Sequence, residues 1–344
     1  MLNTPHGMIL VYKSGNPQGP ALVTLHDLGL DGFSNYQSFF TCPIMHPILS
    51  KFCIYHITAP GQQAGAADIP THSPYPSMEQ LSEMVESVCH HYSVSHCVGL
   101  GVGMGANVLV RLASMRPKLI DGLIVINCNS QTSGWREWAY HKVNMKALKK
   151  AKRLPDSVVN YLVWHHLGST VKARGSYGIN LAAMYRQYFR TEVNPSNFAR
   201  LLESYVTRSD LSIARNSDKR NRMLRVPVLN IVGEQSCHVD GTIVFNMKVD
   251  PAQCTWMKIS DAGMVLEEQQ DKVAEAVGLF LQGLGYTVRM GRSRSATVRP
   301  NKLALQTKGK GTFNTFCTYF LQKHDHILTC NFLQRPLKII FCKG

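Results

Sequence analysis

A strand that runs into a glycine-rich turn and then a helix constrains this chain more than any other feature. The segment Val98–Asn107 reads VGLGVGMGAN, with Gly101, Gly103 and Gly105 at alternate positions. Glycines at this spacing allow a turn too tight for side chains, and a short apolar run before them is typical of a buried strand. In the frame G-x-S-x-G the central residue of such a turn is a nucleophile. Because the centre here is glycine, no side chain at this position can attack a substrate.

The same glycines also fit a second frame, G-x-G-x-x-G/A, which binds dinucleotides and would use Gly101, Gly103 and Ala106. That motif follows the first strand of its sheet and needs an acid at the end of a later strand, about 20 residues on. Here other strands are predicted ahead of the turn, and Asp121 precedes the next strand instead of ending it. Dinucleotide binding is the weaker interpretation, and no cofactor is expected.

Short apolar runs alternate with helical segments along the chain. Strands are predicted at residues 8–13, 21–25, 53–58, 96–100, 123–128, 228–232 and 255–259. Helices are predicted at 77–92, where Ser77 and Gln80 are spaced as a capping box, at 107–115 and at 271–284. This alternation favours an α/β fold with a mostly parallel central sheet and helices on both faces. The turn-rich link at 15–20 predicts a hairpin between the first two strands.

A long stretch without a strand signal separates the strands at 123–128 and 228–232. Helical periodicity recurs there at residues 135–150, 155–166, 179–190 and 195–207. We expect an inserted helical cap over about residues 130–225, above the carboxyl edge of the sheet. Its first helix carries cations at helical spacing: Lys142, Lys146, Lys149 and Arg153. Such a basic face suits solvent, an acidic partner or an anionic lipid surface.

The chain changes character after Tyr286. Residues 287–344 hold eleven Lys or Arg and a single acid, Asp325, and so carry most of the net charge of +15. The segment RSRSAT at 292–297 fits R-x-R-x-x-[S/T], a pattern that basophilic kinases recognise, with Thr297 and Ser295 as candidate phosphorylation sites. We predict a folded domain at 1–286 and a flexible basic tail at 287–344. Such a tail suits anionic membranes or acidic protein surfaces, and no specific nucleic-acid binding is expected.

The expected cellular compartment and the expected absence of a metal site both rest on signals that we do not find in the sequence. No apolar run reaches the roughly 20 residues that a spanning helix needs, and no basic-then-apolar leader opens the chain. The ten cysteines are scattered singly, without a CxxC pair. This pattern favours free thiols in a cytoplasmic protein, with peripheral membrane contact open, and no metal site.

Several ordered segments resemble the N-myc downstream-regulated family, a branch of the α/β-hydrolase superfamily. They read TLHDLGL at 24–30, APGQQAGA at 59–66, YPSMEQL at 75–81, GLGVGMG at 99–105 and FLQGLGY at 280–286. The resemblance spans roughly residues 3–299. It implies an α/β-hydrolase-like fold and a non-enzymatic role in signal transduction, differentiation and stress response, exerted through protein partners and regulated by phosphorylation of the tail.

The resemblance also indicates where the other two residues of a hydrolase triad would lie. The acid would follow the strand at 228–232, where the turn reads GEQS and puts Ser236 in its place. The histidine would follow the strand at 255–259, where DAGM puts Met264 in its place. With Gly103 at the nucleophile position, this pattern predicts that nucleophile, acid and base are all missing.

Other polar residues near these positions are candidates for a substitute site. His26 and Asp27 correspond to the loop that shapes the oxyanion hole, where we expect them to tie that loop to its neighbours. Cys237, His238 and Asp240 lie near the acid position, but adjacent side chains in a turn usually point apart. Two alternatives to an adaptor therefore stay open: a small-molecule or lipid binder that uses a pocket under the cap, and a hydrolase with a rebuilt site.

Overall fold

A computed structural model describes residues 1–70, 72–133, 148, 151, 153–216 and 222–288, and the backbone of 329–330 and 337–338. The chain forms two compact units, Met1–Gly291 and Arg292–Gly344, whereas the sequence placed the boundary at 286/287. In the second unit, β9 (Thr329–Cys330) pairs antiparallel with β10 (Leu337–Lys338). Several sequence predictions lie outside the described residues: the helix at 135–150 apart from residue 148, Lys142, Lys146, Lys149, Ser295 and Thr297.

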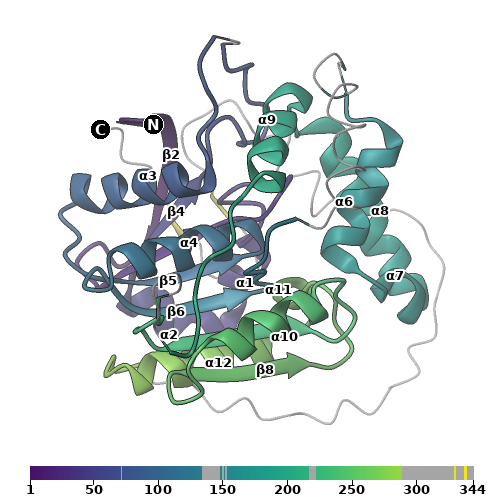
Figure 1. Ribbon diagram of the computed structural model, residues 1–344. Helices are drawn as coiled ribbons and strands as arrows, with labels where there is room; N and C mark the ends of the chain where they lie inside the picture. The colour runs from purple at the N-terminus through teal and green to yellow at the C-terminus, as the bar shows by residue number, and fades with distance from the viewer. Residues whose placement is uncertain are drawn as a thin grey trace. The chain divides into compact units, whose positions relative to one another are not determined.

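One eight-stranded sheet runs through the first unit in the order β1-β2-β4-β3-β5-β6-β7-β8 (Figure 1). Its strands are β1 (Leu2–Thr4), β2 (Gly7–Gly15), β3 (Ala21–Leu25), β4 (Cys53–Thr58), β5 (Cys97–Val102), β6 (Ile120–Ile126), β7 (Val228–Gly233) and β8 (Cys254–Ile259). Within this sheet the β1–β2 and β2–β4 pairs are antiparallel, and the other pairs are parallel. The mostly parallel sheet predicted from the alternating pattern is confirmed.

The hairpin predicted between the first two strands is wrong. β2 pairs antiparallel with β4, and β3 pairs parallel with β4 on its other side. The link at 15–20 is held against the end of α2 (His46–Lys51), since the N–H of Asn16 donates to the carbonyl of Phe52 at 2.8 Å. The link from β2 to β3 therefore passes from one side of β4 to the other. As a result, both edges of β4 are hydrogen-bonded to a neighbouring strand.

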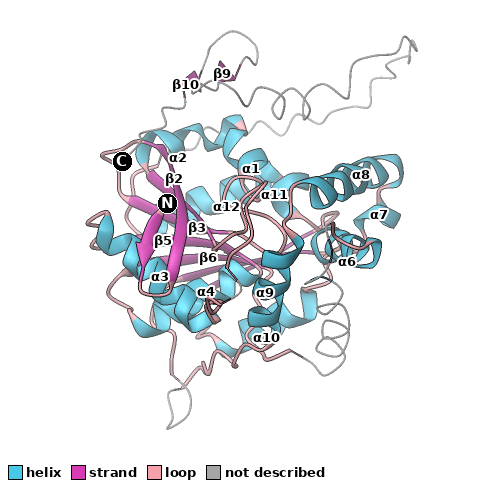
Figure 2. Cartoon of the chain, turned by 90° about the horizontal axis from the view of Figure 1, so that it is seen from above, coloured by secondary structure: helices cyan, strands magenta, loops and turns pink. Residues whose placement is uncertain are grey.

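Helices cover both faces of the sheet (Figure 2). Alternate strand residues belong to two separate cores, as the two-residue period of a strand requires. One core contains residues of α3 (Met78–His91), α4 (Met104–Met115) and α10 (Val239–Lys248). The opposite core contains residues of α1 (Gln37–Thr41), η1 (Pro43–Met45), α2, α11 (Val265–Glu268) and α12 (Gln270–Gly283).

The segment between β6 and β7 folds as further helices. They are α6 (Asp156–Leu167), α7 (Thr170–Ala173), α8 (Gly175–Thr191) and α9 (Pro195–Val206). Their buried residues join the core on the α3–α4 face. In Figure 1, β6 and β8 point toward the side on which α6, α7 and α8 lie. The cap therefore stands beside the carboxyl edge of the sheet, where ligands bind in open α/β sheets.

Local signals located most helices to within a few residues. Ser77 and Gln80 form the predicted capping box at the start of α3. The helix predicted at 107–115 begins earlier, at Met104, directly after the glycine turn. Within the described residues no disulfide bond is present, and none of the described helices is both long and apolar enough to cross a membrane.

Candidate functional site

Close approach of backbones fixes two of the three glycines in the turn between β5 and α4. A Cβ on Gly101 would lie 2.6 Å from the backbone of Ala106 in the first turn of α4. A Cβ on Gly105 would overlap the carbonyl oxygen of Leu25, at the end of β3. Backbone atoms cannot give way as a flexible side chain can. Glycine is therefore required at both positions by the way β3, β5 and α4 meet.

The central glycine, Gly103, is required by a nearby carboxylate side chain and not by a close backbone. Gly103 has φ +50° and ψ −108°, a backbone conformation that L-residues rarely adopt. A Cβ built there would overlap the carboxyl carbon and both carboxylate oxygens of Asp27. Leu25 pairs with Gly101, so the loop after β3 starts beside the turn and brings Asp27 to it. Asp27 thus takes the space into which a side chain at position 103 would extend.

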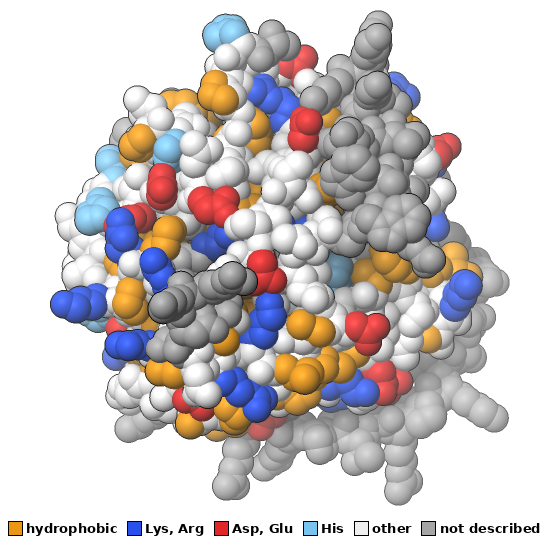
Figure 3. All heavy atoms as spheres, viewed as in Figure 1, with side chains coloured by type: hydrophobic (Ala, Val, Ile, Leu, Met, Phe, Trp, Pro, Cys, Tyr) orange, Lys and Arg blue, Asp and Glu red, His pale blue; other side chains and the backbone are white. Residues whose placement is uncertain are grey.

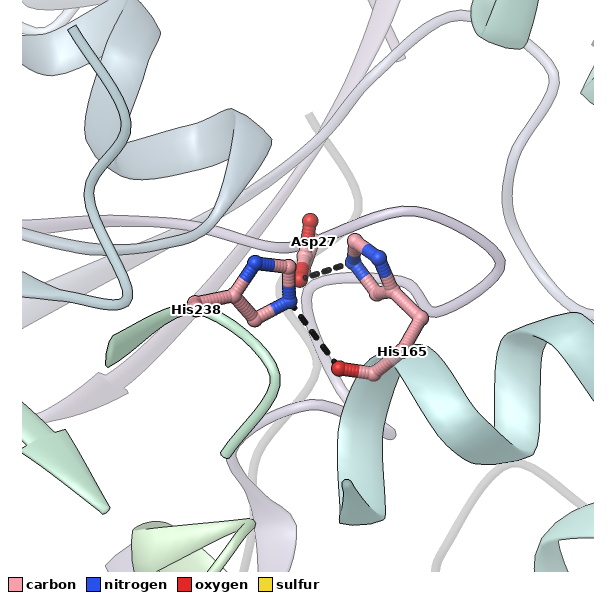
Figure 4. Close-up of side chains that lie close together, drawn as sticks. All are labelled: Asp27, His165 and His238. Atoms are coloured by element: carbon pink, nitrogen blue, oxygen red, sulfur yellow. Dashed lines mark hydrogen bonds and ion pairs between the residues drawn. The ribbon is translucent and has the colours of Figure 1, made fainter. Parts of the chain in front are cut away.

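Both oxygens of Asp27 are bound by hydrogen-bond donors. Oδ1 accepts the backbone N–H groups of Leu28 at 2.8 Å and Met104 at 2.9 Å. Oδ2 lies 2.8 Å from Nε2 of His165, which belongs to α6 of the cap (Figure 4). Asp27 is 1% exposed and His165 is 3% exposed. This carboxylate therefore links the sheet, the start of α4 and the cap inside the protein.

The surroundings keep Asp27 ionised. Burial by itself would raise the pKa of this carboxyl, but the nearby imidazoles and the hydrogen bond from His165 outweigh it. The pKa of Asp27 consequently lies well below its usual range. The two backbone N–H donors act in the same direction, because hydrogen bonds to a carboxylate favour its charged form.

Two further histidines line the site. His238 precedes α10, and its Nε2 donates to the His165 carbonyl at 3.0 Å, with the two rings edge to face. His166 donates from Nε2 to the carbonyl of Leu28 at 2.9 Å. Burial lowers the pKa of His238 to about 3 and that of His166 to about 4. Both rings are therefore neutral near pH 7.

The other two positions predicted for a triad lie in different surroundings. Ser236 is buried after β7, where its Oγ donates to Oδ1 of Asn127 at 3.3 Å and accepts the backbone N–H of His238 at 3.1 Å. Met264 immediately precedes α11 and is 6% exposed in the core. Ser236 thus contacts a neighbour of Asp27, whereas Met264 serves packing.

His26 holds the loop after β3 through its ring. Nδ1 donates to the carbonyl of Asp27 at 2.8 Å, and Nε2 accepts the N–H of Ala59 at 3.0 Å. The neighbouring candidates after β7 include two side chains that converge on one backbone oxygen. Cys237 and His238 both contact the carbonyl of His165, and Asp240 is exposed.

Sequence reasoning missed His165. It lies 138 residues from Asp27 in the chain and carries no motif. The periodicity that predicted its helix marks apolar positions only, so it gives no reason to single out a histidine on the buried face.

A surface cleft of about 350 Å³ opens between α6, α7 and α8. Its lining includes Trp164, Lys172 and Arg186, and it does not include Asp27 or Gly103. Trp164 is 53% exposed there. This cleft lies on the cap itself and is separate from the glycine turn.

Comparisons with known proteins identify the relatives of this chain. The Ndr family model matches residues 1–288. Protein NDRG1 of Xenopus tropicalis is 36% identical over 305 residues, covering 86% of this chain and 74% of that protein. Protein NDRG4-B of Xenopus laevis is 35% identical over 306 residues, covering 86% of this chain and 80% of that protein.

Solved structures show the fold. A thermophilic esterase from Thermogutta terrifontis aligns with a TM-score of 0.66 at 16% identity, over 81% of this chain and 94% of its own. MenH from S. aureus aligns with a TM-score of 0.60 at 17% identity, over 82% of this chain and all of its own. The fold is that of the α/β-hydrolases.

Proposed function

This chain belongs to the Ndr family, and we propose that it is a non-enzymatic signalling and adaptor protein whose hydrolase-type site is closed by its own Asp27. One observation carries the proposal: the Asp27 carboxylate fills the space beside Gly103 and binds the N–H groups of Leu28 and Met104. A site in this state has neither a nucleophile nor room for a substrate at the turn.

The geometry around Oδ1 of Asp27 supports closure. In active α/β-hydrolases the oxyanion hole consists of the N–H after the nucleophile and an N–H from the loop after the third strand. The N–H groups of Met104 and Leu28 correspond to these donors and lie 2.9 and 2.8 Å from Oδ1. Donors bind a developing oxyanion at about 2.7–3.1 Å. The carboxylate therefore satisfies the groups that a substrate oxygen would need.

The residues at the proposed triad positions agree with this. Gly103 has no side chain, Ser236 is a weak substitute for an acid, and Met264 cannot act as a base. The direct test is hydrolysis of a p-nitrophenyl ester by the full chain. We expect no turnover above buffer. Turnover that survives repurification and disappears in His165→Gln would contradict the proposal and favour a rebuilt site.

Partners and the tail belong to the same proposal. We assign the chain to the cytoplasm, with roles in signal transduction, differentiation and stress response exerted through protein partners. Among the described residues on the face drawn in Figure 3, Lys and Arg side chains are interspersed with Asp and Glu. The basic segment after Gly291 is the better candidate for an electrostatic contact.

That segment is proposed to bind anionic membranes and to be released by phosphorylation. Each Lys or Arg near an anionic surface contributes about 1 kcal/mol, and phosphate on Thr297 adds roughly −1.5 to −2 charges. Binding to phosphatidylserine vesicles should weaken after treatment with a basophilic kinase, and Thr297→Ala should prevent the change. Thr318→Ala, which leaves Ser295 and Thr297 available and has no arginines at the motif positions before it, is the matched control.

The vesicle experiment also needs a chain without the tail. The cut belongs after Gly291, because Val288 is 3% exposed and packs against the core. We expect this shortened chain to lose most of its binding to the vesicles. We also expect it to capture fewer protein partners from cells than the intact chain does. Equal vesicle binding by intact and shortened chains would contradict an electrostatic role of the tail.

The cleft on the cap favours a second candidate, a small-molecule binder. Trp164 offers an apolar surface, and Lys172 and Arg186 offer cations, so an amphiphile with an anionic end fits the lining. A fluorescent fatty acid should bind the full chain, and Lys172→Glu with Arg186→Glu should weaken its binding. Lys118→Glu, an exposed lysine in another cleft, is the control.

A further inference from the structure

We propose that Asp27, His165 and His238 form an internal site for a divalent transition-metal ion, with Zn²⁺ as the best match. One potential ligand atom from each residue lies within 4.8 Å of the other two. Figure 4 shows the Asp27 carboxylate between the two imidazole rings. This inference goes beyond the proposed function, because it concerns binding of a cation and not turnover of a substrate.

The donor set suits such an ion. Two imidazoles with one carboxylate are found in sites for zinc and for ferrous iron, whereas magnesium and calcium prefer sites made of oxygen. The ionised Asp27 is 1% exposed. In the described part of the chain no Lys or Arg forms an ion pair with it, and its charge is met only by backbone N–H groups and imidazoles. A dication bound at Oδ2 would compensate the buried charge more completely than hydrogen bonds do.

Two of the ligands are already oriented by other bonds. Oδ1 of Asp27 is held by the N–H groups of Leu28 and Met104, which leaves Oδ2 as the donor oxygen. Nε2 of His238 donates to the carbonyl of His165, so binding of a metal through Nδ1 would keep this hydrogen bond. Metal-binding histidines commonly donate their second ring nitrogen to a carbonyl or carboxylate in this way.

The spacing of the Asp27–His165 pair is compatible with coordination. Nε2 of His165 lies 2.8 Å from Oδ2 of Asp27. Tetrahedral bonds of about 2.1 Å hold two ligand atoms about 3.4 Å apart, so a small outward shift of either side chain would admit the ion. Nε2 of His165 would bind the ion through its lone pair, in place of the proton that it shares with Oδ2 of Asp27.

The position of the ligands indicates what the ion would do. Asp27 follows β3, His165 lies in α6 of the cap, and His238 precedes α10. An ion bound to all of them would cross-link the cap to two loops at the carboxyl edge of the sheet. Since His238 is the half-buried member, exchange with solvent is expected on its side. The metal would then set how firmly the cap is attached.

The test uses the full chain freed of metal by a chelator and titrated with Co²⁺, which reports its ligands by visible absorption. We expect one equivalent to bind with the absorption of nitrogen and oxygen ligands, and Zn²⁺ to displace it. His238→Gln should weaken binding at least about 100-fold, because even residues that only support metal ligands contribute 10–100-fold. The double variant His90→Gln, His91→Gln removes an exposed histidine pair from α3 and should bind as the wild type does.

Asp27→Asn provides a second variant that removes the charge and keeps the shape. Circular dichroism establishes that both variants fold, and Zn²⁺ should raise the Tm of the wild type and of the His90/His91 control only. Equal affinity in wild type and His238→Gln would overturn the proposal. A sulfur charge-transfer band would also overturn it, because the ion would then be on cysteine. Ester hydrolysis is measured separately, so either proposal can fail without the other.

Discussion

Replacing Gly103 with serine restores the nucleophile of a hydrolase and should instead destabilise this protein severely. The new Cβ would overlap all three carboxylate atoms of Asp27, so the carboxylate must leave its position. Leu28 and Met104 N–H and the His165 ring then lose their acceptor. Hydrogen bonds to a charged group contribute about 1.5–3 kcal/mol each, and the backbone strain adds about 1–3 kcal/mol.

These contributions are not fully additive, and we expect a loss of about 4–7 kcal/mol in the free energy of unfolding. That is a large part of the roughly 5–15 kcal/mol that stabilises a typical protein. Urea denaturation followed by circular dichroism measures it. Gly65→Ser is the matched control, because Gly65 has φ +64° and a Cβ placed there would have no atom within 4 Å. The free energy of unfolding of the control should fall only by the backbone strain, about 1–3 kcal/mol.

A double-mutant cycle with Asp27→Gly separates the overlap from general damage. Asp27→Gly alone should lower the free energy of unfolding by about 3–5 kcal/mol, since it removes one partner of a buried ion pair. Adding Gly103→Ser to that variant should lower the free energy of unfolding only by the backbone strain, because no carboxylate remains to overlap the new Cβ. Simple additivity of the two changes, or a Gly103→Ser protein as stable as the Gly65→Ser control, would refute the reasoning.

Other predictions concern activity, pH and helix capping. The triple variant Gly103→Ser, Ser236→Asp, Met264→His should show at most weak esterase activity in a p-nitrophenyl ester assay, because the groups around the turn are not held in the geometry that a transition state requires; a robust kcat would indicate an organised site. Burial lowers the pKa of His56 to about 4, below its unfolded value, so its contribution is complete above about pH 6.5 and is lost as pH falls toward 4. The loss amounts to about 3 kcal/mol, and His56→Gln should flatten the urea stability profile between those limits. Ser77→Ala removes the N-cap of α3 and should lower the free energy of unfolding by about 1 kcal/mol in the same assay.

Local sequence signals determined the elements and their class. Short β-rich runs located β3 and β4 to the residue, and Ser77 with Gln80 located the start of α3. These signals succeed because side-chain period, capping and turn formation each depend on residues a few positions apart. In the turn at Gly103 only Gly101 is required by nearby residues, since its Cβ would meet Ala106, whereas Gly103 and Gly105 are required by Asp27 and Leu25.

The tertiary structure alone decided how the strands are ordered and what occupies the turn. Nothing local indicates that β2 pairs with β4 and not with β3, because strand pairing joins residues far apart in the sequence. The sequence placed Asp27 in the correct loop, yet its carboxylate reaches Gly103 only because β3 and β5 are adjacent in the sheet. His165 reaches Asp27 from a helix 138 residues away. Contacts over such separations follow from sheet order and cap placement, which arise from the burial of the whole core and not from any short stretch of residues.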